Sequence, residues 1–252
     1  MKVIFVGAGP GDPELLTLKA ARLLQHCRCC VYAGSLVSPE VLALLPADAE
    51  KHDSAAMTLE ETTAVCKHAQ QRGEDVIRLH TGDPSIYGAI REQMVELDKL
   101  GIDYEVVPGV SSFQAAAAAL RAELTAPEVS QTIILTRTSG RTPMPAGQEL
   151  EQMARTHATL CIFLSVHQMS QVAATLTEHY GAECPIAVVY RASWPDQLII
   201  RGTLADIAGK VAAAAIGKTA MIIAGRALDW SGAVSRLYSE EFSHGYREAK
   251  PS

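Results

Sequence analysis

Short apolar runs alternate with longer amphipathic segments through the first half of the chain. The apolar runs predict buried strands at residues 3–6, 29–33, 74–80 and 104–107. The amphipathic segments predict helices at residues 13–25, 38–45, 58–71, 85–100 and 109–120. Asp12 is a candidate N-cap of the first helix, and Thr58 with Glu61 has the spacing of a capping box. This alternation predicts a parallel sheet with helices on both faces.

The pattern stops at residues 121–127, which have no clear period, and then restarts. Strands are predicted at residues 132–136, 160–164, 186–190, 198–201 and 221–224, and helices at 147–155, 167–178 and 204–215. Some of these strands follow one another too closely for a helical crossover, so the second sheet is expected to be mixed. The sequence therefore predicts two α/β domains, residues 1–120 and 121–252.

Three turns follow predicted parallel strands of the first domain. They are Gly7-Ala8-Gly9-Pro10-Gly11-Asp12-Pro13, Thr81-Gly82-Asp83-Pro84-Ser85-Ile86-Tyr87-Gly88 and Pro108-Gly109-Val110-Ser111-Ser112. The carboxyl ends of parallel strands meet at one edge of a sheet, where open α/β folds bind ligands. Glycine lets backbone approach a ligand closely, and the helices that follow begin with free N–H groups. The three turns together predict one small-molecule site.

The first turn differs from the dinucleotide fingerprint. The third glycine of G-x-G-x-x-G is replaced by Asp12, and Pro10 has no N–H group to offer a pyrophosphate. The expected acidic ribose partner, about twenty residues on, is also absent, because that region contains Val31, Tyr32 and Ala33. The turn therefore favours a ligand without a pyrophosphate.

Composition and charge indicate which partners the protein binds and in which cellular compartment it works. The chain has 252 residues, is 48% hydrophobic and has a formal net charge of -6. It has no basic stripe of the kind that binds nucleic acid, and no apolar run long enough to span a membrane. Met1 leads directly into a strand, which predicts a cytoplasmic protein without a signal peptide. The six cysteines include Cys27, Cys29 and Cys30 but no paired zinc motif, so no metal is expected.

The turns, in this order and spacing, resemble the class III S-adenosylmethionine-dependent tetrapyrrole methyltransferases over nearly the whole chain. The residues that carry the resemblance are Val6-Gly7-Ala8-Gly9-Pro10-Gly11-Asp12-Pro13-Glu14-Leu15-Leu16-Thr17, Gly82-Asp83-Pro84, Pro108-Gly109-Val110-Ser111-Ser112 and Tyr190-Arg191-Ala192-Ser193-Trp194-Pro195-Asp196-Gln197. Within the family, Tyr32-Ala33-Gly34-Ser35-Leu36-Val37 and Phe242-Ser243-His244-Gly245-Tyr246-Arg247 are similar to the branch that methylates C-11 of precorrin-4 in cobalamin biosynthesis.

The resemblance implies two α/β domains with S-adenosylmethionine in the cleft between them, a tetrapyrrole substrate and a homodimer. It implies cofactor contacts from Pro10, Thr81, Gly82, Asp83, Ile86, Ser111, Ser112, Leu164, Ala192 and Ala220. Many relatives have Met in place of Leu164 and Thr-Ala in place of Ser111-Ser112, so those contacts are expected to differ in kind.

Substrate contacts are predicted from charge and loop position. The substrate carries several carboxylates and the protein is acidic, so local guanidinium groups are needed, and Arg137, Arg141 and Arg191 are the candidates. Ser35 follows the second strand at the same edge as the cofactor turns. It is one strand-helix-strand step from residues 7–13, so the two loops are expected to be neighbours.

Methyl transfer to carbon requires positioning more than covalent catalysis. If a base removes a proton afterwards, Asp12, Asp83, Tyr87 and His80 are candidates by position alone.

Two alternatives stay open. One is methyl transfer on the same fold to another tetrapyrrole position, or to another acceptor such as rRNA or a diphthine precursor; the missing basic stripe disfavours rRNA. The other is a cofactor-binding regulatory module, which the retention of all the loops disfavours. The sequence does not decide whether the substrate already contains cobalt.

Overall fold

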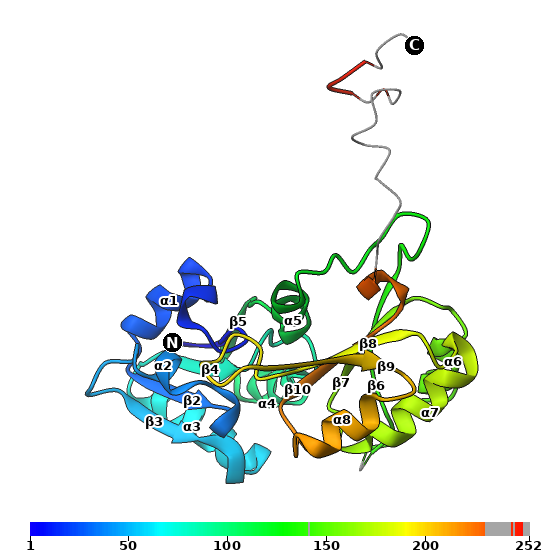
Figure 1. Cartoon of the computed structure of the whole chain (residues 1–252). Coiled ribbons are helices and arrows are strands. Elements are labelled where there is room, and N and C mark those ends of the chain that lie inside the picture. The colour runs from blue at the N-terminus through cyan, green and yellow to red at the C-terminus, as the bar shows by residue number, and fades with distance from the viewer. Residues whose placement is uncertain (141, 230–242, 244, 249–252) are drawn as a thin grey trace. The chain divides into compact units, whose positions relative to one another are not determined.

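The computed structural model describes residues 1–140, 142–229, 243 and 245–248. It divides into two compact units, Met1–Ala116 with Arg191–Leu198, and Ala117–Tyr190 with the residues from Ile199 onward. Each unit is built on its own five-stranded sheet (Figure 1). The assignment of residues 1–120 and 121–252 as domains stays a prediction.

The first sheet is entirely parallel, as predicted, with the strand order β3-β2-β4-β1-β5. Its strands are β1 (Lys2–Gly7), β2 (Cys29–Tyr32), β3 (Glu50–Asp53), β4 (Val76–His80) and β5 (Asp103–Val107). The helices of this part of the chain are α1 (Leu18–Gln25), α2 (Pro39–Leu42), α3 (Leu59–Gln71), α4 (Ile90–Leu100) and α5 (Ser112–Leu120).

Alternation along β1 gives this sheet a core on each face. Ile4 and Val6 pack with the buried side chains of α1 and α2 on one face. Val3 and Phe5 pack with those of α3 and α4 on the other. Because side chains alternate along a strand, a fully apolar strand of this kind must be covered on both sides, and the helices cover it (Figure 1).

The second sheet is mixed, as predicted, with the order β6-β7-β10-β8-β9. Its strands are β6 (Ile133–Arg137), β7 (Thr159–Phe163), β8 (Pro185–Tyr190), β9 (Leu198–Thr203) and β10 (Ala220–Ala224). The pair β6 and β7 is parallel, whereas β10 is antiparallel to both β7 and β8. The helices α6 (Leu150–Ala154), α7 (Met169–Tyr180) and α8 (Ile207–Ala213) contribute buried residues to one core with β7, β8 and β10.

Three elements differ from the prediction. The first predicted helix is split into a 3₁₀ turn, Pro13–Leu15, capped by Asp12, and α1, capped by Thr17. Helix α4 begins at Ile90 rather than at residue 85, because Tyr87 and Ala89 adopt positive φ. Strand β3 was missed, since Glu-Lys-His-Asp has no apolar alternation. The predicted capping box of Thr58 and Glu61 is confirmed.

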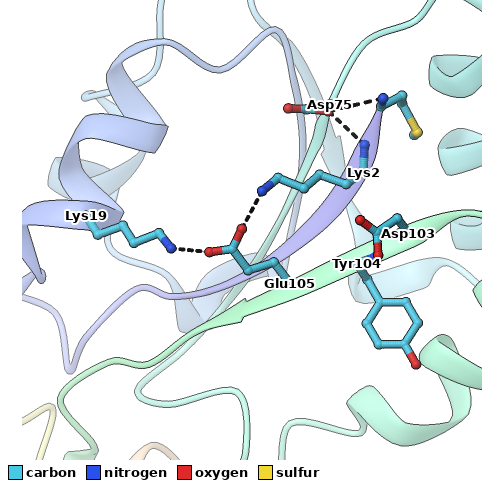
Figure 2. Close-up of polar contacts among 7 residues, drawn as sticks. Lys2, Lys19, Asp75, Asp103, Tyr104 and Glu105 are labelled. Atoms are coloured by element: carbon cyan, nitrogen blue, oxygen red, sulfur yellow. Dashed lines mark hydrogen bonds and ion pairs between the residues drawn. The ribbon is translucent and has the colours of Figure 1, made fainter.

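An ion-paired network connects elements near the amino ends of β1 and β5 (Figure 2). The Glu105 carboxylate contacts the ammonium groups of both Lys2 and Lys19. Asp75 accepts a hydrogen bond from the backbone N–H of Lys2 at 2.7 Å. The two lysines lower the pKa of Glu105 to about 2 from the ordinary 4.5 through their hydrogen bonds to its carboxylate.

Candidate functional site

The strand order places a topological switch point between β1 and β4. These two strands are neighbours, yet the helix after β1 packs on one face of the sheet and the helix after β4 on the other. The connections that follow β1 and β4 therefore leave the sheet toward opposite faces. Open α/β sheets bind ligands at such a point, beyond the carboxyl ends of the two strands. Residues 7–13 follow β1 and residues 81–88 follow β4; residues 108–112 follow β5, the other neighbour of β1.

Backbone hydrogen bonds join the first two turns directly. Gly9 N–H donates to the Gly82 carbonyl at 3.2 Å, and Gly82 N–H donates to the Gly9 carbonyl at 2.8 Å. Ala8 N–H donates to the His80 carbonyl at 2.7 Å. Gly9 and Gly82 both have positive φ, +67° and +63°, which favours glycine at both positions.

The third turn is in backbone contact with the other two. A Cβ atom on Gly109 would lie 2.2 Å from the Gly82 carbonyl oxygen and 2.9 Å from the Gly7 Cα atom. A Cβ atom on Gly7 would lie 2.6 Å from the Gly109 Cα atom. Such distances are far below van der Waals contact, so these glycines are required by packing of backbone on backbone. The structure brings the three predicted turns together.

Asp83 braces two of the turns. Its Oδ2 atom accepts a hydrogen bond from Gly109 N–H at 2.9 Å, and its Oδ1 atom accepts one from Ser85 N–H at 2.8 Å and another from the Ser85 hydroxyl. Burial raises the pKa of Asp83, but the hydrogen bonds from Ser85 and Gly109 outweigh it and hold the pKa below its usual value. Asp83 is thus an ionised acceptor that fixes backbone, and this arrangement favours a positioning role over that of a base.

The segment Arg191–Leu198 belongs to the same unit as the turns. Trp194 Nε1–H donates to the Pro10 carbonyl at 2.7 Å, and the Ser193 hydroxyl accepts from Asp12 N–H at 3.0 Å. A Cβ atom on Gly11 would lie 2.1 Å from the Trp194 ring. The family resemblance includes this segment but assigns no role to Trp194. The sequence alone could not place this indole beside the first turn, because 184 residues separate Trp194 from Pro10.

The other predicted cofactor residues of this unit lie on the same turns. Ser111 and Ala192 are buried, Ile86 and Ser112 are half-buried, and Thr81 is exposed. Ser112 is the first residue of α5. Their contacts with a cofactor stay predictions.

Leu164, after β7 in the second unit, combines two unusual features. Its φ is +55°, and its side chain is 66% exposed. A bulky residue in a left-handed conformation is strained, and strained residues gather at ligand sites. The neighbouring Ser165 hydroxyl is buried, donates to the Phe163 carbonyl at 2.6 Å and accepts from Thr138 N–H at 2.8 Å. The loop is therefore held in a shape that exposes Leu164, which supports its predicted cofactor contact.

Ala220 is the half-buried first residue of β10 and pairs with Tyr190 of β8. It follows Thr219, whose φ is +55°. Nothing else in the structure distinguishes Ala220, and its cofactor contact stays a prediction.

The predicted substrate residues are placed differently from one another. Ser35 is exposed on a 3₁₀ turn, Gly34–Leu36, after β2. Its strand is not adjacent to β1, since β4 lies between them. The loops nevertheless meet, because the Ser38 hydroxyl donates to the Gly11 carbonyl at 2.5 Å.

The arginines have structural contacts of their own. Arg137 donates to the carbonyls of Thr138, Thr142 and Pro143 and so supports the loop after β6. Arg191 pairs with Asp196 at 2.5 Å, and its guanidinium lies 4.8 Å from the centre of the Trp194 ring. Arg141 lies outside the described residues, as do two residues of the quoted tail motif, Phe242 and His244.

The candidate bases His80, Asp12 and Tyr87 have different surroundings in the structure. Burial, aided by Arg78, lowers the pKa of His80 to about 3, so its ring is neutral and weakly basic at neutral pH. Asp12 caps the Pro13–Leu15 turn by accepting from Glu14 N–H at 2.8 Å. Tyr87 is 46% exposed with a φ of 54°. None of these observations selects a base.

The family model of tetrapyrrole (corrin/porphyrin) methylases matches residues 2–208. The chain belongs to the tetrapyrrole methylases. Among curated family members, it is 52% identical to the cobalt-precorrin-4 C(11)-methyltransferase of Methanocaldococcus jannaschii over 98% of this chain and 96% of that protein. It is 50% identical to the precorrin-4 C(11)-methyltransferase of Pseudomonas aeruginosa over 98% of this chain and 99% of that protein.

Solved structures of tetrapyrrole methylases agree with the fold. A cobalt precorrin-4 methyltransferase has 45% identity and a TM-score of 0.88, with 90% of this chain and 96% of that one covered. A uroporphyrin-III C-methyltransferase from Thermus thermophilus, complexed with S-adenosylhomocysteine, has 31% identity and a TM-score of 0.77, with 91% and 99% covered. Among the described residues, no helix is long and apolar enough to cross a membrane.

Proposed function

We propose that this chain transfers a methyl group from S-adenosylmethionine to C-11 of precorrin-4, or of its cobalt complex, in cobalamin biosynthesis. The observation that carries the proposal is the full-length identity of about half to C(11)-methyltransferases of both kinds, on a chain that keeps the three turns in mutual contact. Another tetrapyrrole position on the same fold is the alternative.

The residues fit the cofactor. Gly7, Gly9, Gly82 and Gly109 leave backbone without side chains at the switch point of the sheet, and the Trp194 ring closes against Gly11. Pro10, Thr81, Gly82, Asp83, Ile86, Ser111, Ser112 and Ala192 would hold the cofactor on the first unit, and Leu164 and Ala220 would contribute from the second.

When bound, S-adenosylmethionine supplies a methyl group on a positively charged sulfur, which an electron-rich ring carbon accepts. The task of the protein is then to fix donor and acceptor in line, which contributes several kcal/mol to catalysis. Asp83 performs part of this task by fixing Gly109 relative to its own turn. The residues that would bind the substrate carboxylates are Ser35, Arg137, Arg141 and Arg191.

The test is methyl transfer with the purified protein. S-adenosylmethionine with a ¹³C-labelled methyl group is incubated with precorrin-4, cobalt-precorrin-4, precorrin-3 and uroporphyrinogen III, and the labelled carbon of each product is assigned by NMR. Label at C-11, formed only from the two precorrin-4 substrates, is the expected result. Label at another ring position would establish the alternative, and the ratio of the two rates would decide whether cobalt is inserted first.

We also propose that the protein works in the cytoplasm as a homodimer. The support is the resemblance to the tetrapyrrole methyltransferases. Light scattering at micromolar concentration tests the dimer, and a monomeric mass would contradict it.

A further inference from the structure

A cluster of three metal-binding side chains lies away from the turns. Cys29 begins β2, Glu50 begins the neighbouring edge strand β3, and His52 lies two residues further along β3. Cys29 and Glu50 are register partners in this parallel pair. Because residues two apart on a strand share a face, Glu50 and His52 point to the same side of the sheet, where the Cys29 thiol lies. The Cys29 sulfur, a Glu50 carboxylate oxygen and a His52 ring nitrogen all lie within 4.8 Å of one another.

From this geometry, we propose that Cys29, Glu50 and His52 form a site for a divalent metal ion of the zinc type, with solvent as a fourth ligand. Thiolate, carboxylate and imidazole are the ligands that Zn²⁺ takes in proteins. Bonds of about 2.0–2.3 Å in a tetrahedron place ligand atoms roughly 3.4 Å apart, so small side-chain rotations would complete the site. Glu50 is 48% exposed, which gives the ion a route from solvent and room for a water ligand.

The histidine is oriented for this role. His52 Nε2 lies 2.9 Å from Glu50 Oε1. This nitrogen is buried, and the contact lacks the geometry of a hydrogen bond. A buried polar atom without a hydrogen bond costs free energy, and a metal ion between Nε2 and Oε1 would remove that cost.

Neighbouring charges support a bound cation. Arg72 donates to the second oxygen of Glu50, Oε2, at 2.8 Å and to Glu74 at 2.8 Å, which orients the Glu50 carboxylate and leaves Oε1 for the ion. With a divalent ion bound, the three negative groups, the Cys29 thiolate, Glu50 and Glu74, balance Arg72 and the ion. Binding has to displace the thiol proton, because burial and the nearby Glu50 raise the pKa of Cys29 to about 12.

The site is separate from the proposed reaction. Cys29 and Glu50 begin their strands, whereas the ligand turns follow the carboxyl ends of β1, β4 and β5. The ion would join the edge strand β3, whose residues are mostly exposed and polar, to the interior strand β2. The expected consequence is a stabilised sheet edge rather than a change in methyl transfer.

Cobalt(II) is the probe. The full-length protein, reduced and freed of metal with a chelator, is titrated with Co²⁺ without oxygen, and the near-ultraviolet charge-transfer band of a cobalt–thiolate bond is recorded. We expect one equivalent per chain, displaced by Zn²⁺, with no band in Cys29→Ser and at least tenfold weaker binding in His52→Gln. Cys161→Ser, a buried cysteine on β7 of the other sheet, is the matched control and keeps the band.

His52→Gln keeps the test valid if Cys29→Ser does not fold, because His52 is only half-buried. Circular dichroism checks the fold of each variant. Zn²⁺ should raise the melting temperature of the parent protein but not that of His52→Gln. The proposal is overturned if the parent shows no cobalt–thiolate band, if folded Cys29→Ser retains it, or if His52→Gln binds Co²⁺ as tightly as the parent.

Discussion

At the scale of single residues, the proposed cofactor site depends on glycines. Because glycine has no side chain, the backbones of the three turns can pack directly against one another. Gly109 faces the Gly82 carbonyl, and this carbonyl is itself fixed by the hydrogen bond from Gly9 N–H. Backbone held in this way has little freedom to yield to a new side chain. Asp83 adds a side-chain brace to the same backbone.

Gly109→Ala tests this packing. Its Cβ atom would lie 2.2 Å from the Gly82 carbonyl oxygen, so the two turns must separate. We expect affinity for S-adenosylhomocysteine to fall by tenfold or more, about 1.4 kcal/mol, in isothermal titration calorimetry. The control is Gly209→Ala in α8, where a Cβ atom meets nothing within 4 Å. It should leave affinity unchanged and raise stability by about 0.5–1 kcal/mol. Equal affinity in both variants would remove the third turn from the site.

Ser35→Leu tests the predicted substrate contact. Ser35 is exposed on the loop that reaches Gly11 through Ser38, so its hydroxyl is available to a macrocycle carboxylate. Methyl transfer should fall by about tenfold or more, roughly 1.4 kcal/mol in the barrier. Affinity for S-adenosylhomocysteine should stay within about twofold, because the cofactor uses other turns. Normal turnover would remove Ser35 from the site, and a lost cofactor affinity would place it beside the cofactor.

At the scale of elements, connections decide where chemistry is possible. Neighbouring strands β1 and β4 send their helices to opposite faces, and this divergence creates the switch point. Near the amino ends of β1 and β5 in the same sheet, ion pairs with Glu105 join β1, β5 and α1 (Figure 2). We expect these ion pairs to stabilise the protein in a pH-dependent way.

Glu105→Gln should destabilise the protein at neutral pH, because it removes both lysine contacts. The folded pKa of Glu105, about 2, is below its ordinary value of 4.5. The contribution is therefore complete above about pH 4.5 and is lost as pH falls toward 2. Urea unfolding at a series of pH values should show the gap between parent and variant closing in this window. Glu151→Gln, which removes a helix-surface pair with Arg155, is the control and should change stability less. A gap that does not narrow on acidification would contradict the assignment.

At the scale of the whole molecule, ligand binding and stability are linked. A ligand that binds only the folded chain stabilises it, by about 2.7 kcal/mol at roughly 100 times the dissociation constant. We expect S-adenosylhomocysteine to bind once per chain and to raise the melting temperature, measured by calorimetry. NAD and ATP should give no comparable shift, because Asp12 and Pro10 depart from a pyrophosphate-binding turn. Stabilisation by NAD alone would show that the cofactor assignment is wrong.

The sequence by itself determined the alternation of elements, the two kinds of sheet and the three turns. These follow from local patterns: apolar runs, caps and glycine positions, which require no knowledge of distant residues. The pattern failed at β3, whose polar residues are strand only because β2 offers a free edge, and at the start of α4, where Tyr87 and Ala89 adopt positive φ.

Only the tertiary structure decided which distant groups meet. The bond from Trp194 to Pro10 spans most of the chain, and the cluster of Cys29, Glu50 and His52 exists only because two strands pair in one register. The tertiary structure also places β4 between β1 and β2. The physical reason is that strand order and side-chain encounters are set by how the whole chain buries its apolar faces, and local spacing carries little of that information.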